Sequence, residues 1–356
     1  MQDLLNLVEL QDSARQVLGR ARERGAPEAD LWGTLIELGW LGVCLPAENG
    51  GLGQPFAALA TLYQELGRVL APHDFVGVSI CLSALAGVAG DGCVARETIA
   101  QTLAGAARPM CTGTLPREIK AVDGRLRGVI RGVLDVGAAS HLLVPFEAAG
   151  PVLALLKIPH PGLSIVRRPT WDLTRRLFDV VAEDAAVEPR DVVFEGAAAT
   201  AVMKMTEAQL NLALACDAVG GSEAIFGETL LYMQSRHQFG RPIASFQALK
   251  HRCADLATEM SASGALLIAG CDALSMLQGD WESRAACSRL YAGEVYRRVT
   301  EEAIQLHGGI GFTWEHQCHR YLKRARLNEV LGGTPEQRKD ALAPALFRGA
   351  ASNAAV

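Results

Sequence analysis

Between about residues 106 and 200 the pattern of apolar and turn-forming residues changes, and this stretch most constrains the possible fold. Short apolar runs alternate there with turn residues, at 142–144, 152–156 and 192–194. Asp123-Gly124, placed between two short pairs of strand-forming residues, is a strong hairpin turn signal. The stretch therefore predicts a small antiparallel β domain.

The part of the chain before about residue 105 is predicted to be helical. Leu31, Leu35 and Leu38 recur at the spacing that places side chains on one helix face. Gly39 then suits a C-terminal cap, because glycine readily adopts the left-handed conformation that ends many helices. A turn-rich break at 46–53 separates this helix from another one through residues 59–66.

Long helices are predicted again from about residue 206. The run Thr206-Glu207-Ala208-Gln209 has the form of a capping box, with the threonine at the helix start and the glutamine reaching back to it. Farther along, apolar side chains spaced by three and four form a seam of the kind found in helical bundles. This seam comprises Phe246, Leu249, Cys253, Leu256 and Met260.

Together these patterns predict a mainly α protein with a central β domain. The predicted parts are an N-terminal helical domain (1–105), a middle β domain (106–200) and a C-terminal helical bundle (201–356). Two or three domains also suit a chain of 356 residues, which is too long for one small core.

Composition argues against several classes of function. The formal net charge of −5 gives no electrostatic reason to expect nucleic-acid binding. No apolar run reaches the roughly 18–20 residues needed to span a bilayer, and the N-terminus lacks the basic and apolar regions of a secretory signal. Nine cysteines without a Cys-x-x-Cys pair indicate buried thiols, so we expect a protein of the reducing cytoplasm.

Two segments near the C-terminus carry groups that a flavin dinucleotide requires. Arg236 offers a permanent charge and a planar set of donors for phosphate, and Gly308 and Gly309 let backbone amides approach a ligand closely. The segments that contain them, 235–240 and 305–316, closely resemble C-terminal signatures of the acyl-CoA dehydrogenase family. Members of this family are flavoenzymes that introduce a double bond into acyl-CoA thioesters.

The resemblance extends over nearly the whole chain, including residues 37–53 and 169–176. It implies the family fold, with an N-terminal helical domain, a small antiparallel β domain and a C-terminal four-helix bundle. It also implies FAD as cofactor, an acyl-CoA as substrate, and contacts in which several of these groups reach the FAD of a neighbouring subunit. The implied cofactor-binding residues are Arg236, Phe239, Phe246, Gln247, Gln305, Leu306, His307, Gly308, Gly309, Thr334 and Glu336.

The positions at which the family keeps its catalytic glutamate hold no carboxylate here. By resemblance these positions are Gly332 and Leu210, and Asn211 stands where an arginine usually follows the second one. Abstraction of the α proton needs a base within hydrogen-bond reach, so neither residue can supply it. Glu207 and Glu329 are weak substitutes. A helix-start preference accounts for Glu207 more simply, and an ion cluster with nearby Arg324 and Arg326 does so for Glu329.

The predicted β domain departs from the family as well. The family's Trp-(Ile/Val)-Thr segment, which shelves the flavin ring, corresponds to Gly132-Val133-Leu134-Asp135, which lacks both the indole and the hydroxyl. The loop expected to carry Thr-Glu-Pro and Gly-Ser-Asp is shortened to residues 111–116. The chain thus retains residues that would reach a neighbour's FAD and lacks those that would hold its own.

This pattern resembles the base-lacking subunit of bacterial heteromeric (α2β2) acyl-CoA dehydrogenases of steroid side-chain degradation. The resemblance implies an oxidoreductase of lipid β-oxidation that works as a heterotetramer, with a homologous catalytic subunit as partner. Two alternatives stay open. One is a flavoenzyme of the same fold with monooxygenase-type chemistry, and the other is a non-catalytic acyl-CoA binder.

The remaining reactive side chains predict no further site. Glu315, His316, Cys318 and His319 could hold a metal ion, and His-x-x-His can lie on one helix face. The family carries a similar stretch without a metal, so packing is favoured and no metal site is predicted. Cys111 and Cys216 lack an evident histidine partner and are expected to be inert thiols.

Overall fold

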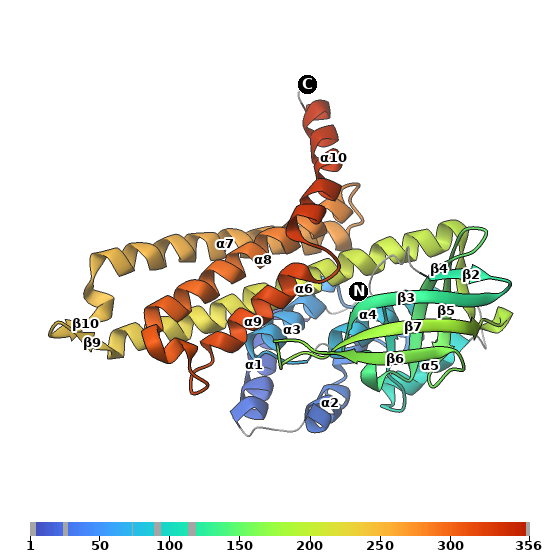
Figure 1. Ribbon diagram of the computed structural model, residues 1–356, viewed down its shortest axis with the longest axis horizontal. Helices are drawn as coiled ribbons and strands as arrows, with labels where there is room; N and C mark the ends of the chain where they lie inside the picture. Colours follow the sequence, from blue (N-terminus) through green and yellow to red (C-terminus); the bar gives the residue numbers. More distant parts are fainter. Residues whose placement is uncertain (1–4, 24–27, 73, 89–93, 113–118, 354–356) are drawn as a thin grey trace. The chain divides into compact units, whose positions relative to one another are not determined.

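The computed structural model describes residues 5–23, 28–72, 74–88, 94–112 and 119–353 (Figure 1). The chain forms two compact units. Unit 1 comprises Met1–Leu10, Gly19–Leu59 and Pro72–Leu210, and unit 2 comprises Gln11–Leu18, Ala60–Ala71 and Asn211–Val356. The predicted three-domain boundaries stay predictions, and each unit is considered by itself.

The helices of the N-terminal third confirm the helical prediction for that region. They are α1 (Leu7–Glu23), α2 (Glu28–Glu37), α3 (Phe56–Arg68), α4 (Asp74–Ala86) and α5 (Val94–Leu103), with short 3-10 turns at Trp40–Gly42 and Ala47–Asn49. Gly39 has φ 69° and donates its N–H to the carbonyl of Ile36 at 2.9 Å. The predicted glycine cap is therefore confirmed, because this left-handed conformation suits glycine.

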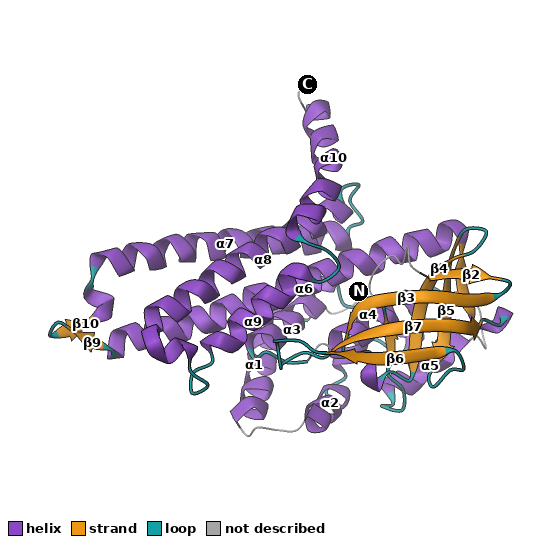
Figure 2. Ribbon diagram, viewed as in Figure 1, coloured by secondary structure: helices purple, strands orange, loops and turns teal. Residues whose placement is uncertain are grey.

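Unit 1 also contains an eight-stranded sheet (Figure 2). Its strands are β1 (Pro109–Cys111), β2 (Ile119–Val122), β3 (Arg125–Leu134), β4 (His141–Glu147), β5 (Pro151–Lys157), β6 (Leu163–Arg168), β7 (Leu177–Ala186) and β8 (Val192–Glu195). The order is β6-β7-β3-β2-β4-β5-β8, with β1 beside β4, and every pair is antiparallel except β1 and β2 with β4. The predicted β region is thus confirmed.

Local sequence explains two features of this sheet. Asp123 (φ 50°) and Gly124 (φ 73°) form the two-residue turn between β2 and β3, as the hairpin signal predicts. The apolar runs at 142–146 and 152–156 are buried without alternation in the paired strands β4 and β5. Both faces of these strands therefore lie in the core of unit 1.

Unit 2 is a bundle of long helices. It contains most of α6 (Gly196–Ser235), together with α7 (Gln247–Ser275), α8 (Trp281–His307), α9 (Cys318–Val330) and α10 (Pro335–Asn353). Between α6 and α7 lie the short strands β9 (His237–Gln238) and β10 (Arg241–Pro242) and a 3-10 turn, Ile243–Ser245, and another 3-10 turn, η6 (Gly308–Phe312), follows α8. Cys253 and Leu256 of the predicted seam are buried, and Leu249 packs against Cys253, Met233 and Leu306.

The predicted capping box at Thr206 is wrong. Helix α6 begins at Gly196, so Thr206 and Gln209 lie in its interior. The alanines at 197–199 favour helix and extend it toward the N-terminus, which removes the need for a cap at 206. Gln209 instead donates a hydrogen bond from Nε2 to Ser83 Oγ at 2.9 Å.

Candidate functional site

The turn after α6 presents an aromatic ring and an arginine to solvent. Phe239 is 91% exposed and adopts φ 54°, an uncommon value for a non-glycine residue. Its ring meets that of Phe246 edge to face at 6.1 Å, and the guanidinium of Arg241 lies 4.2 Å above the Phe246 ring. Arg236 is exposed at the base of the same turn. A large apolar ring this exposed suits contact with a ligand or another chain.

The end of α8 carries the second group of predicted cofactor residues. Gln305, Gly308 and Gly309 are exposed, whereas Leu306 and His307 are buried. Gly308 has φ 62° and ψ −141°, a conformation essentially restricted to glycine. A Cβ atom on Gly308 or Gly309 would meet nothing within 4 Å, so both backbones are open to close approach.

Tyr232 joins these two groups. Its hydroxyl donates a hydrogen bond to the carbonyl of His307 at 3.3 Å, and its ring stacks on the His307 ring at 4.3 Å. Beneath this contact, Met233, Cys253 and Leu306 form one buried cluster. The structure therefore brings together the exposed residues Arg236, Phe239, Gln305, Gly308 and Gly309, which we call the bundle end.

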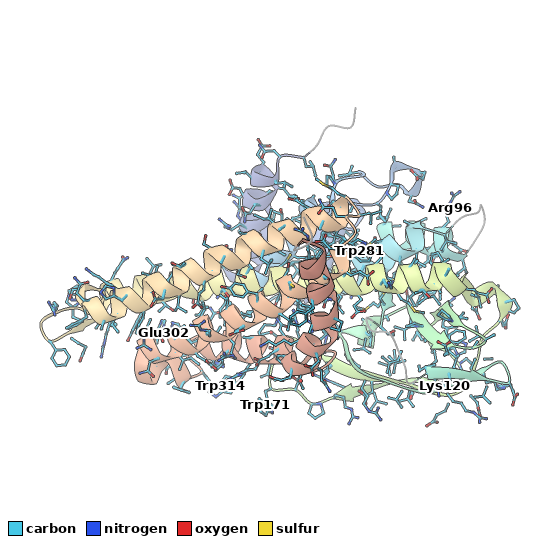
Figure 3. All side chains as sticks on the ribbon, turned by 90° about the horizontal axis from the view of Figure 1, so that it is seen from above. Arg96, Lys120, Trp171, Trp281, Glu302 and Trp314 are labelled. Carbon is cyan, nitrogen blue, oxygen red and sulfur yellow. The ribbon has the colours of Figure 1, made fainter. Side chains whose placement is uncertain are left out.

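Thr334 and Glu336 lie apart from the bundle end. The Thr334 hydroxyl accepts from the N–H of Gln337 at 3.3 Å while Gln337 Oε1 accepts from the N–H of Thr334 at 2.9 Å, a reciprocal cap on α10. Backbone and Thr334 hydrogen bonds hold the pKa of Glu336 below its usual value. Arg289 of α8 donates a hydrogen bond to the carbonyl of Leu331, three residues before Thr334. Arg289 itself lies sixteen residues before Gln305 along α8, which corresponds to about 24 Å of helix. Figure 3 labels Trp281 and Glu302 near the two ends of α8.

Arg289 spans the two segments that hold the predicted base positions, Leu210 and Gly332. It donates from Nη1 to Asn211 Oδ1 at 2.8 Å and from Nη2 to the carbonyl of Leu331, the residue before Gly332. Asn211 is 8% exposed. A fixed guanidinium cannot accept a proton, and neither Leu210 nor Gly332 has an ionisable side chain.

The two weak substitutes occupy ordinary environments. Glu329 pairs with Arg326 at 3.0 Å and with Arg297 at 3.6 Å, so the predicted ion cluster around it is confirmed for Arg326. Arg324 was expected in that cluster but is wholly buried elsewhere, because its guanidinium pairs with Asp217 at 2.8 Å. Glu207 is exposed in the interior of α6 rather than at its first turn, so a helix-start preference does not account for it.

Three of the four residues expected to shelve a flavin ring are buried, namely Val133, Leu134 and Asp135. Asp135 Oδ1 accepts from both the backbone N–H and the Nε of Arg176, at 3.1 and 2.9 Å. Arg176 Nη2 in turn donates to Asp74 Oδ1 at 2.9 Å. Gly132 stays open, because a Cβ atom there would meet nothing within 4 Å. The segment therefore lacks the indole and the hydroxyl that would shelve a flavin ring, and its carboxylate is bound to Arg176. Of the shortened loop at 111–116, residues 113–116 lie outside the described residues.

The structure groups two of the metal-capable residues, His316 and Cys318, with His307 and not with His319. His307, His316 and Cys318 bring three possible ligand atoms within 4.8 Å of one another. His319 instead meets the Trp314 ring edge to face at 4.7 Å (Trp314 is labelled in Figure 3). His316 precedes α9, so His316 and His319 do not share a helix face.

Sequence patterns could not identify several of these contacts. Arg289 meets partners 78 and 42 residues away, and Tyr232 meets one 75 residues away. No local motif marks such pairs.

For Cys216, burial raises the pKa of the thiol, which agrees with the expected inert role.

Comparison with known proteins gives consistent matches. The family model for the acyl-CoA dehydrogenase C-terminal domain matches residues 200–347, and the one for the N-terminal domain matches residues 9–92. The acyl-CoA dehydrogenase IpdE2 of Mycobacterium tuberculosis is 34% identical over 89% of this chain and 86% of its own. IpdE2 of Mycolicibacterium smegmatis is 30% identical over 96% of each chain.

Solved structures show the same fold. A variant of the Tcur3481-Tcur3483 steroid ACAD aligns with a TM-score of 0.84 and 27% identity, over 97% of this chain and 98% of that one. The ChsE4-ChsE5 complex from Mycobacterium tuberculosis aligns with a TM-score of 0.84 and 22% identity, over 96% and 97%. Among the described residues, no helix is both long and apolar enough to cross a membrane.

Proposed function

The chain belongs to the acyl-CoA dehydrogenase family, and on that premise we propose that it is the base-lacking subunit of a heteromeric enzyme. It completes the FAD site of a homologous catalytic partner. In this family reaction a carboxylate takes the α proton of the acyl-CoA, and FAD accepts the hydride from the β carbon. The partner subunit supplies that carboxylate.

One contrast carries the proposal. The bundle end exposes Arg236 and Phe239, which by resemblance match family contacts to the ADP portion of FAD, and Gln305, which matches a cofactor-contacting position. The shelf segment, in contrast, lacks the indole and the hydroxyl, and its Asp135 is paired with Arg176. A chain built in this way is suited to contact a flavin held by another chain and not to hold a flavin ring of its own.

The base positions support the same division of labour. Arg289 fills the space between Asn211 and Leu331 with a permanent positive charge. Glu329, three residues before Gly332, is committed to arginine partners. We therefore assign no catalytic residue to this chain.

The names of the similar proteins guide the proposed substrate class. The chain is similar to IpdE2 and to a steroid ACAD, and it shares its fold with a two-component complex. We propose a steroid-derived or related lipid acyl-CoA as substrate, turned over in the cytoplasm as a step of β-oxidation in an α2β2 assembly.

Co-expression with the adjacent reading frame tests the proposal. We expect a stable complex with about one FAD for every two chains, measured by flavin absorbance and light scattering. Arg236→Ala is expected to lower the FAD content, whereas Arg190→Ala, an exposed arginine in unit 1, should leave it unchanged.

Two other outcomes would redirect the assignment. A homotetramer of this chain alone, active and with one FAD per chain, would contradict the proposal. Complexes that never contain flavin would favour a non-catalytic acyl-CoA binder, which the pairing of Asp135 with Arg176 in the shelf segment also permits.

A further inference from the structure

Two imidazoles and a thiol meet where α8 ends and α9 begins. His307 is the last residue of α8, Cys318 is the first residue of α9, and His316 lies between them. The His307 and His316 rings are 4.1 Å apart, and Cys318 Sγ lies 3.4 Å from His307 Nδ1. Candidate ligand atoms of all three side chains fall within 4.8 Å of one another.

His307 is arranged as metal-binding histidines usually are. Its Nδ1 lies 2.8 Å from the carbonyl of Ala303, and a carbonyl can only accept, so the proton sits on Nδ1. Nε2 therefore carries the lone pair. This nitrogen is buried and has no hydrogen-bond partner among the described residues, in a side chain that is 3% exposed. Histidine ligands commonly donate their other nitrogen to a backbone carbonyl in this way.

Cys318 supplies the third ligand. Its side chain is fully buried beside the His307 ring. A bound cation would displace the thiol proton, because the thiolate is the form that binds metals. Cys318 thus adds a third possible ligand to the two imidazoles.

We propose that His307, His316 and Cys318 bind Zn²⁺ or a chemically similar thiophilic divalent cation, with a water molecule as fourth ligand. A thiolate and two imidazoles suit zinc and do not suit Mg²⁺ or Ca²⁺, which prefer oxygen. Tetrahedral zinc places its ligand atoms about 3.5 Å apart. Because Cys318 Sγ now lies beside the protonated Nδ1 of His307, the thiol has to shift toward Nε2 for both atoms to reach one ion.

His316 makes this adjustment feasible. It is half-buried, and its Nδ1 accepts from the Cys318 N–H over a long 3.3 Å. The ion would bind the Nδ1 lone pair of His316, which now accepts the hydrogen bond from the Cys318 N–H. The half-buried position also leaves one side of the site open to water.

The ion would tie the start of α9 to the end of α8 across η6, the turn that contains Gly308 and Gly309. The sequence-based prediction weighed His316 with His319, whereas the structure pairs His316 with His307. This inference does not rest on the proposed function, because flavin and partner play no part in it.

Cobalt titration of the full chain tests the site. The protein is freed of metal with a chelator, kept reduced with a phosphine, and titrated with Co²⁺ alone and then with Zn²⁺. We expect one Co²⁺ per chain, a thiolate-to-cobalt absorption band in the near ultraviolet, and its loss when Zn²⁺ is added. Zn²⁺ should also raise the melting temperature.

The variants separate ligation from incidental binding. Cys318→Leu should abolish the charge-transfer band and weaken binding at least about 100-fold, since even losing a supporting contact costs about 10–100-fold. Cys287→Ala, which removes a half-buried thiol elsewhere on α8, should behave like the unaltered chain. If Cys318→Leu does not fold, His316→Ala gives the same comparison at a half-buried position.

Two results would overturn the proposal. One is the absence of a thiolate band in the unaltered chain at saturating Co²⁺. The other is equal Co²⁺ affinity in the unaltered chain and in Cys318→Leu or His316→Ala, which would mark the metal as adventitious.

Discussion

Arg324 and Asp217 form an ion pair in unit 2, with 2.8 Å between Nη1 and Oδ1, although Arg324 is wholly buried. The guanidinium also donates to the carbonyls of Leu70 and Ala71, each at 3.0 Å. Asp217 Oδ2 accepts from Asn328 Nδ2 at 2.6 Å. The pair thus links α6 and α9 to the residues that follow α3.

Asp217→Ala is expected to destabilise the protein strongly. The substitution leaves the Arg324 charge buried without its counter-charge, which costs about 3–5 kcal/mol in the free energy of unfolding. Urea denaturation measures the change. Arg326→Met, which breaks half-exposed pairs with Glu329 and Glu301, serves as control and should cost less than about 1 kcal/mol. Equal effects of the two substitutions would contradict this interpretation.

Phe239→Ala should separate cofactor contact from stability. The ring is 91% exposed, so the free energy of unfolding of the chain should change by less than about 0.5 kcal/mol. In the complex with the partner, losing an aromatic surface against the ADP portion should weaken FAD retention about tenfold. Flavin absorbance after gel filtration measures retention, and Phe347→Ala removes another exposed ring as control. Unchanged FAD retention in Phe239→Ala would exclude this residue from the cofactor contact.

The predictable part of the fold rests on local chemistry. The turn at Asp123-Gly124, the cap at Gly39 and the seam through Cys253 each depend on residues close in sequence, and the structure confirms all three. The start of α6 was missed because Thr206 and Gln209 satisfy a capping pattern even inside a helix. There the alanine-rich stretch upstream outweighs the local cap signal.

In the candidate site, too, some residues can be predicted from the sequence, whereas contacts between distant residues cannot. The resemblance to the family predicts Arg236, Phe239 and Gln305 as cofactor contacts, and for Arg236 the residue type itself suits a phosphate. Sequence patterns could not show that Arg176 pairs with Asp135 of the shelf segment or that Arg289 spans the predicted base positions. Those contacts join residues 41 to 102 positions apart, and only the folded chain sets their geometry.

Arg176→Met tests whether the shelf segment has a structural role only. The substitution leaves Asp135, which is fully buried, and Asp74, which is 5% exposed, without this cation. Destabilisation of about 3–5 kcal/mol is expected in the free energy of unfolding. The FAD content of the complex that remains folded should equal that of the unaltered complex. A selective loss of FAD with full retention of fold would show that the shelf segment does take part in cofactor binding.

Acid should destabilise the chain partly through His319. Burial lowers the pKa of this residue, and Lys323, Arg320 and His316 lower it further. The unfolded chain binds a proton near pH 6.5, whereas the folded chain resists protonation until lower pH. The free energy of unfolding therefore has its full value above about pH 6.5 and falls as pH drops toward the folded-state pKa, by at most about 1.4 kcal/mol per pH unit for one group.

His319→Leu should flatten this pH dependence, because the substitution removes the group that protonates on unfolding. Urea denaturation at pH 7.5, 6 and 5 gives the three free energies to compare. Since burial also lowers the pKa of His141 and His307, the variant should lose only part of the slope. His251→Leu, at an exposed position on α7, should retain the full slope. An identical pH dependence in His319→Leu and the unaltered chain would show that His319 protonates as readily in the folded state as in the unfolded one.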